Sequence, residues 1–167
     1  MRKVLIIMAA ALCLAGCRVT YSFSGTSIDP DVHTICIPTF EYKAMRVNPS
    51  LANDLSEQLR TRFRRMTSLE QVEMDGDLEI TGEVVGYDVQ ASAVTAQEVA
   101  AQNRLTVVVK VDFNNVKHPE ESFSAKSFSA YADYDSSNSL DAVESTLCAE
   151  IIDKIIEDIF NATVAQW

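Results

Sequence analysis

Glycine, proline and histidine are scarce in this chain, with 5, 4 and 2 residues among 167. It has no glycine-rich phosphate loop, no nucleophile elbow and no Cys-x-x-Cys pair, and neither His33 nor His118 has a Glu or Cys at metal-ligand spacing. Basic residues are also few, because 14 Lys and Arg stand against 24 Asp and Glu, a net charge of −10. This balance argues against nucleic acid as a partner. The residue types therefore favour neither an enzyme nor a protein with a metal or cofactor.

A hydrophobic run long enough to cross a membrane is also missing from the N-terminus. Residues 4–15 are uncharged, but a transmembrane helix needs roughly 20 apolar residues. Arg2 and Lys3 precede the run, as in a secretory signal peptide. The run ends in Leu-Ala-Gly-Cys at residues 14–17, which resembles the lipobox of bacterial lipoproteins, whose Cys is acylated and becomes the first residue. We predict a signal peptide over residues 1–16 and a lipid anchor at Cys17; an ordinary signal peptide or an uncleaved anchor is the alternative.

The residue after the lipobox indicates the membrane. In many Gram-negative lipoproteins an Asp at that position retains the protein at the inner membrane, whereas residue 18 is Arg here. No acidic run follows Cys17, which argues against export to the cell surface. We therefore expect residues 17–167 to form one domain on the periplasmic side of the outer membrane, held there by the acyl anchor.

Of the four cysteines, Cys13 leaves with the signal peptide and Cys17 is acylated, so Cys36 and Cys148 remain. An oxidising periplasm permits a disulfide between them. As free thiols, both would behave as small buried apolar groups. The sequence leaves both alternatives open.

Alternation of apolar and polar residues predicts strands over residues 33–40, 78–89, 104–114 and 122–131, with a further short strand at 18–27. The clearest lies at 104–114 and places five apolar residues on one face, namely Leu105, Val107, Val109, Val111 and Phe113. The polar opposite face indicates an antiparallel sheet exposed to water on one side. Phe123 and Phe128 fall on opposite faces unless a bulge intervenes. Residues 90–102 are either a strand continuation or a long hairpin connection.

Two helices are expected. Asn48-Pro49 is a good start for a helix of about 17 residues. Its predicted apolar stripe consists of Leu51, Leu55, Leu59, Phe63 and Met66. A second helix starts at Asn138 or Ser139, has a broad apolar face and reaches the C-terminus. Strands and helices in this order predict a single α+β domain with a small, largely antiparallel sheet.

Two clusters of polar residues invite a functional interpretation. Four arginines lie near the end of the first helix, namely Arg60, Arg62, Arg64 and Arg65. They can complement the negative helix terminus, or they can bind phosphate groups bidentately. Six residues match the spacing of a calcium loop, namely Asp133, Asp135, Ser137, Ser139, Asp141 and Glu144. Asn138 replaces the required glycine there, and a strand leads into the loop, so we interpret it as a turn and a helix cap.

Taken together, these pieces resemble one family, the lipopolysaccharide-assembly lipoproteins LptE. Cys17 with the Tyr-x-Phe-x-Gly opening at residues 21–25 carries the resemblance, together with residues 103–107, 131–137 and 159–161 and with Trp167. The resemblance implies a two-layer domain in which both helices pack on one face of a small sheet. It also implies a non-enzymatic component of the lipopolysaccharide translocon that plugs the LptD β-barrel, assists its assembly and can bind lipopolysaccharide.

Only Cys17 carries over from the family residue by residue. If lipopolysaccharide is bound, the candidates are Arg60, Arg62, Arg64 and Arg65. Two other functions compete with this interpretation. One is a periplasmic lipid carrier or lipoprotein chaperone, which would need a deep apolar cavity. The other is a structural lipoprotein of a different outer-membrane complex.

Overall fold

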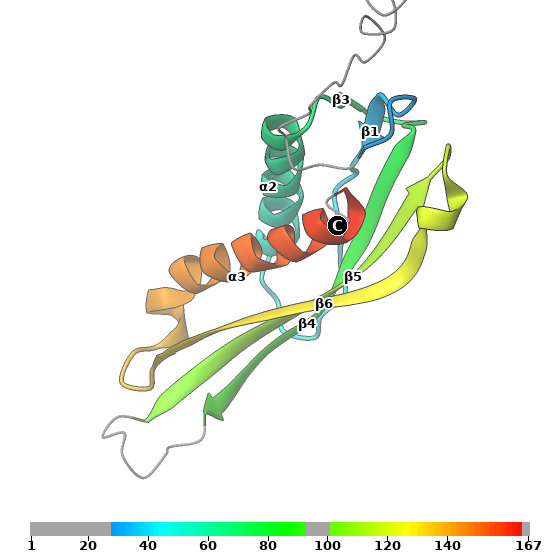
Figure 1. Cartoon of the computed structure of the whole chain (residues 1–167). Helices are drawn as coiled ribbons and strands as arrows, with labels where there is room; N and C mark the ends of the chain where they lie inside the picture. The colour runs from blue at the N-terminus through cyan, green and yellow to red at the C-terminus, as the bar shows by residue number, and fades with distance from the viewer. Residues whose placement is uncertain (1–27, 93–100, 165–167) are drawn as a thin grey trace, which may run out of the picture.

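The computed structural model describes residues 28–92 and 101–164 (Figure 1). The elements follow in the order β1 (Thr34–Cys36), β2 (Glu41–Tyr42), α2 (Leu51–Met66), β3 (Glu70–Val72), β4 (Leu78–Ser92), β5 (Gln102–Asn115), η1 (Pro119–Glu121), β6 (Phe123–Asp135) and α3 (Leu140–Thr163). They share one hydrophobic core, which confirms a single α+β domain. Residues 1–16, Cys17, the expected strand at 18–27 and Trp167 lie outside the described residues.

The six strands form a mixed sheet in the order β3-β1-β4-β5-β6, with β2 also paired to β4. Strands β4, β5 and β6 are antiparallel, but β1 is parallel to both β3 and β4, and β2 is parallel to β4. The expectation of a largely antiparallel sheet is therefore wrong for its short strands. Parallel neighbours need a crossover connection, and the segment containing α2 provides one between β1 and β3. A strand of three residues is too short for its apolar–polar alternation to indicate parallel pairing.

The long strand β5 forms as its alternation predicts. Its five inward side chains are at most 2% exposed, namely Leu105, Val107, Val109, Val111 and Phe113. In the preceding strand Leu78, Ile80 and Val84 are buried in the same core. Residues 90–102 turn out to belong partly to the strands, since β4 continues to Ser92 and β5 begins at Gln102; residues 93–100 lie outside the described residues.

Two register shifts decide which side chains reach the core. Between β4 and β5 the register shifts from Val84 to Gly86, so that Tyr87 points inward. Between β5 and β6 it shifts from the Val111–Lys126 pair to the Phe113–Phe123 pair, with Ala125 at a φ of 50°. The second bulge brings Phe123 and Phe128 together, with ring centroids 6.3 Å apart. The two rings are thus not on opposite faces.

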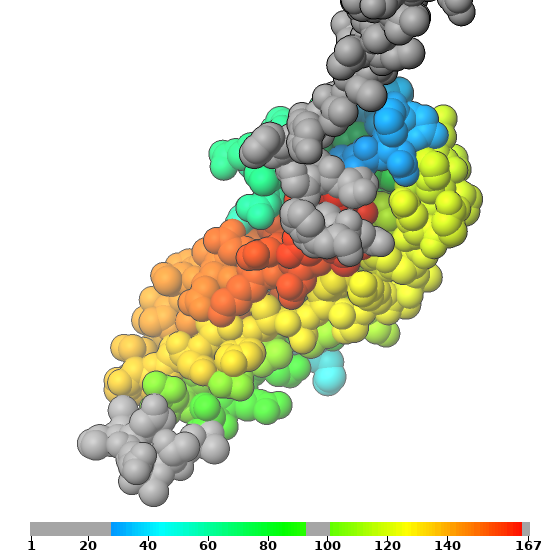
Figure 2. Space-filling view, viewed as in Figure 1, coloured from blue at the N-terminus to red at the C-terminus, as the bar shows by residue number. Residues whose placement is uncertain are grey.

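The helices pack against different parts of the fold. Helix α3 contacts β5 and β6, whereas α2 contacts α3 and β3. Figure 2 shows α3 and β6 side by side over much of the visible face. Helix α2 begins at Leu51, and Asn48 Oδ1 accepts the backbone N–H groups of Ser50 and Leu51 at 3.3 and 3.2 Å. The predicted two-layer packing of both helices on one sheet face stays a prediction. No helix within the described residues is both long and apolar enough to span a bilayer.

The remaining two cysteines are both free and buried. Cys36 Sγ lies in β1 and donates to Glu73 O at 3.2 Å, whereas Cys148 lies in α3, 3.7 Å from Asn48 Nδ2. Burial raises the pKa of both thiols, because a thiolate loses its hydration there. Of the two alternatives that the sequence left open, the structure has the free thiols.

Candidate functional site

The four arginines at the end of α2 point to two sides of the helix. Arg60 Nε donates to Ile37 O at 2.7 Å and its NH2 donates to Thr39 Oγ1 at 3.2 Å, so this side chain ties α2 to the β1–β2 connection. Arg60 also pairs with Glu57. One turn later, Arg64 NH2 donates to Gln71 Oε1 in β3 at 2.9 Å. These two arginines have structural partners.

The other two, Arg62 and Arg65, face α3. They line a groove of about 780 Å³ between the two helices. Arg62 lies over the Phe160 ring, 5.4 Å from its centroid, and its buried Nε has no hydrogen-bond partner in the described part of the chain. Three carboxylates line the same groove, namely Glu57, Asp153 and Glu157. The structure thus divides the predicted cluster into two pairs, and only Arg62 and Arg65 share a hollow that a ligand could enter.

A second hollow of about 450 Å³ continues between the helices towards the start of α3 and contains Gln58, Cys148 and Ile152. A part-buried polar network, which includes Asn48 and Glu144, lines this hollow. The Tyr87 hydroxyl donates to Glu144 Oε1, and Asn48 Nδ2 donates to the same oxygen at 3.3 Å. Burial, together with donation to Glu144, raises the pKa of Tyr87. This network joins β4, α3 and the start of α2, and its groups are already paired.

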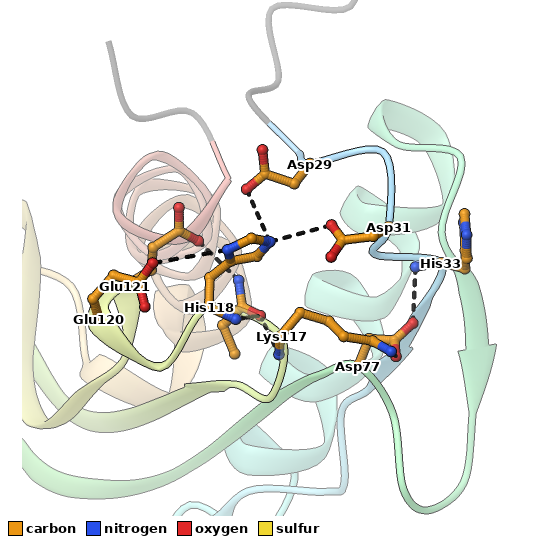
Figure 3. Close-up of polar contacts among 9 residues, drawn as sticks. Asp29, Asp31, His33, Asp77, Lys117, His118, Glu120 and Glu121 are labelled. Atoms are coloured by element: carbon orange, nitrogen blue, oxygen red, sulfur yellow. Dashed lines mark hydrogen bonds and ion pairs between the residues drawn. The ribbon is translucent and has the colours of Figure 1, made fainter.

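A third cluster surrounds His118, just before η1 (Figure 3). Its Nε2 lies 3.2 Å from Asp31 Oδ1 and 3.4 Å from Asp29 Oδ2, and its Nδ1 lies 3.8 Å from Glu120 Oε1. The hydrogen bond with Asp31 raises the pKa of His118 and lowers the pKa of Asp31. Sequence spacing gave no sign of this cluster, because Asp31 lies 87 positions before His118.

The carboxylate of Asp77 binds the next residues along the chain from Asp29 and Asp31. Its Oδ2 accepts the backbone N–H groups of His33 and Thr34 at 2.9 and 3.1 Å. Lys117 Nζ lies 3.5 Å from Asp77 Oδ1. The bond from His33 N–H is the largest cause of the lowered pKa of Asp77.

The residues of the calcium-like pattern have other partners in the structure. Asp133 accepts two hydrogen bonds from Arg104, at 2.7 and 2.8 Å, and Asp135 Oδ1 accepts Ser137 N–H at 2.8 Å. Glu144 accepts the Tyr87 hydroxyl. Within residues 28–92 and 101–164, no group of three His, Cys, Asp or Glu side chains is placed to hold a metal ion.

The outward face of the long strands is polar, as the alternation predicts. It carries Lys110 and Asp112 on β5 and Ser127, Ser129 and Tyr131 on β6, all exposed. Arg104 lies 3.7 Å from the Tyr131 ring centroid while it binds Asp133. This face therefore combines charged, hydroxyl and aromatic groups.

Comparison with known families decides the family of this chain. The LptE model, described as lipopolysaccharide assembly, matches residues 32–163. The chain belongs to the LptE family. The resemblance inferred from the sequence is thus confirmed, and it places this LptE-family protein among non-enzymatic lipoproteins of lipopolysaccharide assembly.

One solved structure shares the fold of this LptE-family chain at low sequence identity, and another is less similar. The hypothetical protein CT253 from Chlamydia trachomatis has a TM-score of 0.51 at 8% identity, covering 79% of this chain and 98% of that one. A minor lipoprotein from Acinetobacter baumannii has a TM-score of 0.48 at 14% identity, covering 78% and 91%. No curated protein sequence matches the chain.

Proposed function

We propose that this protein is an outer-membrane lipoprotein, acylated at Cys17, that plugs an LptD-type β-barrel from the periplasmic side and assists its assembly. The observation that carries the proposal is the LptE match over residues 32–163. The lipobox-like residues 14–17 support the anchor. An anchor of this kind keeps the domain at the membrane where such a barrel resides.

The sheet supports the plugging role by its chemistry. Its outward face presents Lys110, Asp112, Ser127 and Ser129 to solvent. The lumen of an outer-membrane barrel is polar as well. Polar groups of the sheet face can therefore form hydrogen bonds with polar groups of the lumen. Such pairing avoids the cost of burying polar groups without partners.

Co-purification tests the barrel partner. We expect a protein tagged at the C-terminus and extracted from the outer membrane to bring down an LptD-sized barrel in a 1:1 ratio. Mass spectrometry of the N-terminal peptide should show residue 17 as the acylated first residue. A Cys17→Ala variant is the control for the anchor. Recovery of bound lipid without a barrel would contradict the proposal and support a lipid carrier; a different stoichiometric complex would support a structural lipoprotein of another machine.

We propose further that lipopolysaccharide phosphate binds among the four arginines, at the groove of Arg62 and Arg65. Arg60 contacts the β1–β2 connection and Arg64 contacts β3. Arg62 and Arg65 line the groove and are therefore better placed to bind a ligand. Arg65→Glu should weaken lipopolysaccharide binding because it places a like charge beside the phosphate. Arg64→Glu, equally exposed on the other side of α2, is the matched control. Equal binding by wild type and Arg65→Glu, at an unchanged thermal midpoint, would refute this part.

A further inference from the structure

Residues 28–31 are the first described part of the chain, and side-chain contacts attach them to the connection between β5 and β6. Figure 3 shows the Asp29 and Asp31 carboxylates directed at one side of the His118 ring, with Glu120 and Glu121 on the other side. The two aspartates contact His118 Nε2 at 3.4 and 3.2 Å. Ile28 is half-buried and packs against the core, whereas Pro30 and Asp31 are exposed. The contacts of the two aspartates with His118 are therefore the side-chain contacts that attach residues 29–31.

The net charge of the cluster around His118 depends on whether the His118 ring is protonated. Carboxylates reach it from two segments, Asp29 and Asp31 from the N-terminal side and Glu120 and Glu121 from η1. The nearby cation Lys117 is itself paired with Asp77. Lys117 also acts on Asp31 through its charge, but the imidazolium contacts both aspartates directly. A neutral ring therefore leaves the aspartates facing the η1 carboxylates with less compensating charge.

We propose that His118 is a pH-sensitive clasp: protonated, it holds residues 29–31 against the β5–β6 connection, and neutral, it releases them. The direction follows from the contacts with Asp29 and Asp31. They raise the pKa of His118, so the attachment is complete below the ordinary histidine pKa and is lost as the pH rises through the folded-state pKa.

Release is confined to residues 29–31 because the residues on both sides have independent attachments. Ile28 packs against the core. The Val32 side chain is buried, and Asp77 accepts the N–H groups of His33 and Thr34.

Amide hydrogen exchange tests the clasp in the full-length protein purified in detergent. The reporter is the Val32 N–H, which donates to Asp29 O at 3.1 Å within the segment. Protection factors, corrected for the intrinsic rate at each pH, are measured between about pH 5.5 and 8.5, across the range in which histidine titrates. We expect a several-fold loss of Val32 protection as the pH rises, while protection of the β5 amides stays constant.

Three variants give the matched comparison. His118→Gln should have low Val32 protection at every pH, and His118→Arg, which keeps a permanent cation, should have high protection at every pH. His33→Gln should behave like wild type, since His33 is the second histidine and points away from the cluster in Figure 3.

Three outcomes of these measurements would contradict the clasp. Val32 protection that is flat with pH in wild type, or a pH-dependent loss that persists in His118→Gln, would overturn the clasp. An equal loss at Val32 and at the β5 amides would also overturn it, because the effect would then be global unfolding. Exchange is measured without the barrel or lipopolysaccharide, so a failure of the clasp is distinguishable from a failure of the proposed function.

Discussion

The three long strands and the N-terminal segment are held in the same domain by different kinds of contact. Strands β4, β5 and β6 bury rows of apolar side chains in the shared core, where α3 contacts β5 and β6. In residues 28–34, by contrast, Val32 is buried and Ile28 packs half-buried against the core, and the carboxylates of Asp29, Asp31 and Asp77 add polar contacts. Apolar burial involves no titrating group, whereas these polar attachments depend on protonation and are screened by salt. Of the two regions, the N-terminal segment is therefore the one whose attachment responds to pH.

Truncation of the apolar core should have the largest effect. Leu105 in β5 is fully buried, so Leu105→Ala removes apolar burial and leaves a cavity. We expect a loss of about 2–5 kcal/mol in the free energy of unfolding, measured by urea denaturation. Lys110→Ala, at an exposed position of the same strand, should change it by less than about 0.5 kcal/mol. Similar losses for both variants would contradict the division between an apolar core and a polar face.

The buried polar network should have the next largest effect. Tyr87 is 2% exposed and donates to Glu144. Tyr87→Phe removes that donor and leaves the Glu144 carboxylate with one donor fewer, which should cost about 1–3 kcal/mol. A double-mutant cycle with Glu144→Ala, which removes the acceptor, measures the coupling. Additive losses would show that the contact contributes nothing on its own.

Substitution of Asp77 tests the polar attachments of the N-terminal segment. The pKa of Asp77 is lowered in the folded protein, so the stability it contributes is present above its ordinary pKa of 3.8 and is lost as the pH falls through the folded-state value. Asp77→Asn should lower the urea midpoint near pH 7 and reduce the loss of stability in acid. Asp75→Asn is the control within the same turn. An identical acid profile for Asp77→Asn and wild type would refute the role of this carboxylate.

The smallest expected effect is that of reductant. Because Cys36 and Cys148 are buried free thiols, the thermal midpoint should be equal with and without dithiothreitol. Burial raises the pKa of both thiols, so a thiol reagent should label them only on unfolding. A midpoint that drops on reduction would reveal a disulfide instead.

Sequence reasoning succeeded where local pattern and tertiary burial agree. The alternation at residues 104–114 predicted β5 and its inward row. The predicted stripe of α2 is buried at Leu51, Leu55, Leu59 and Phe63, but its last member, Met66, is 40% exposed at the end of the helix. Sequence reasoning failed for the parallel short strands, because strands of two or three residues are too short for a period. It also treated four arginines as one cluster, although residues two apart on a helix do not face the same side.

By itself, the sequence determined the family, the single α+β domain and the inner faces of the long strands, because those depend on residue type and spacing along the chain. Tertiary structure alone decided that β1 lies parallel to β3 and β4, that Arg62 and Arg65 share a groove, and that Asp29 and Asp31 meet His118. Each of these joins segments far apart in the chain. Their meeting depends on how helices and strands pack, and no local periodicity encodes that packing.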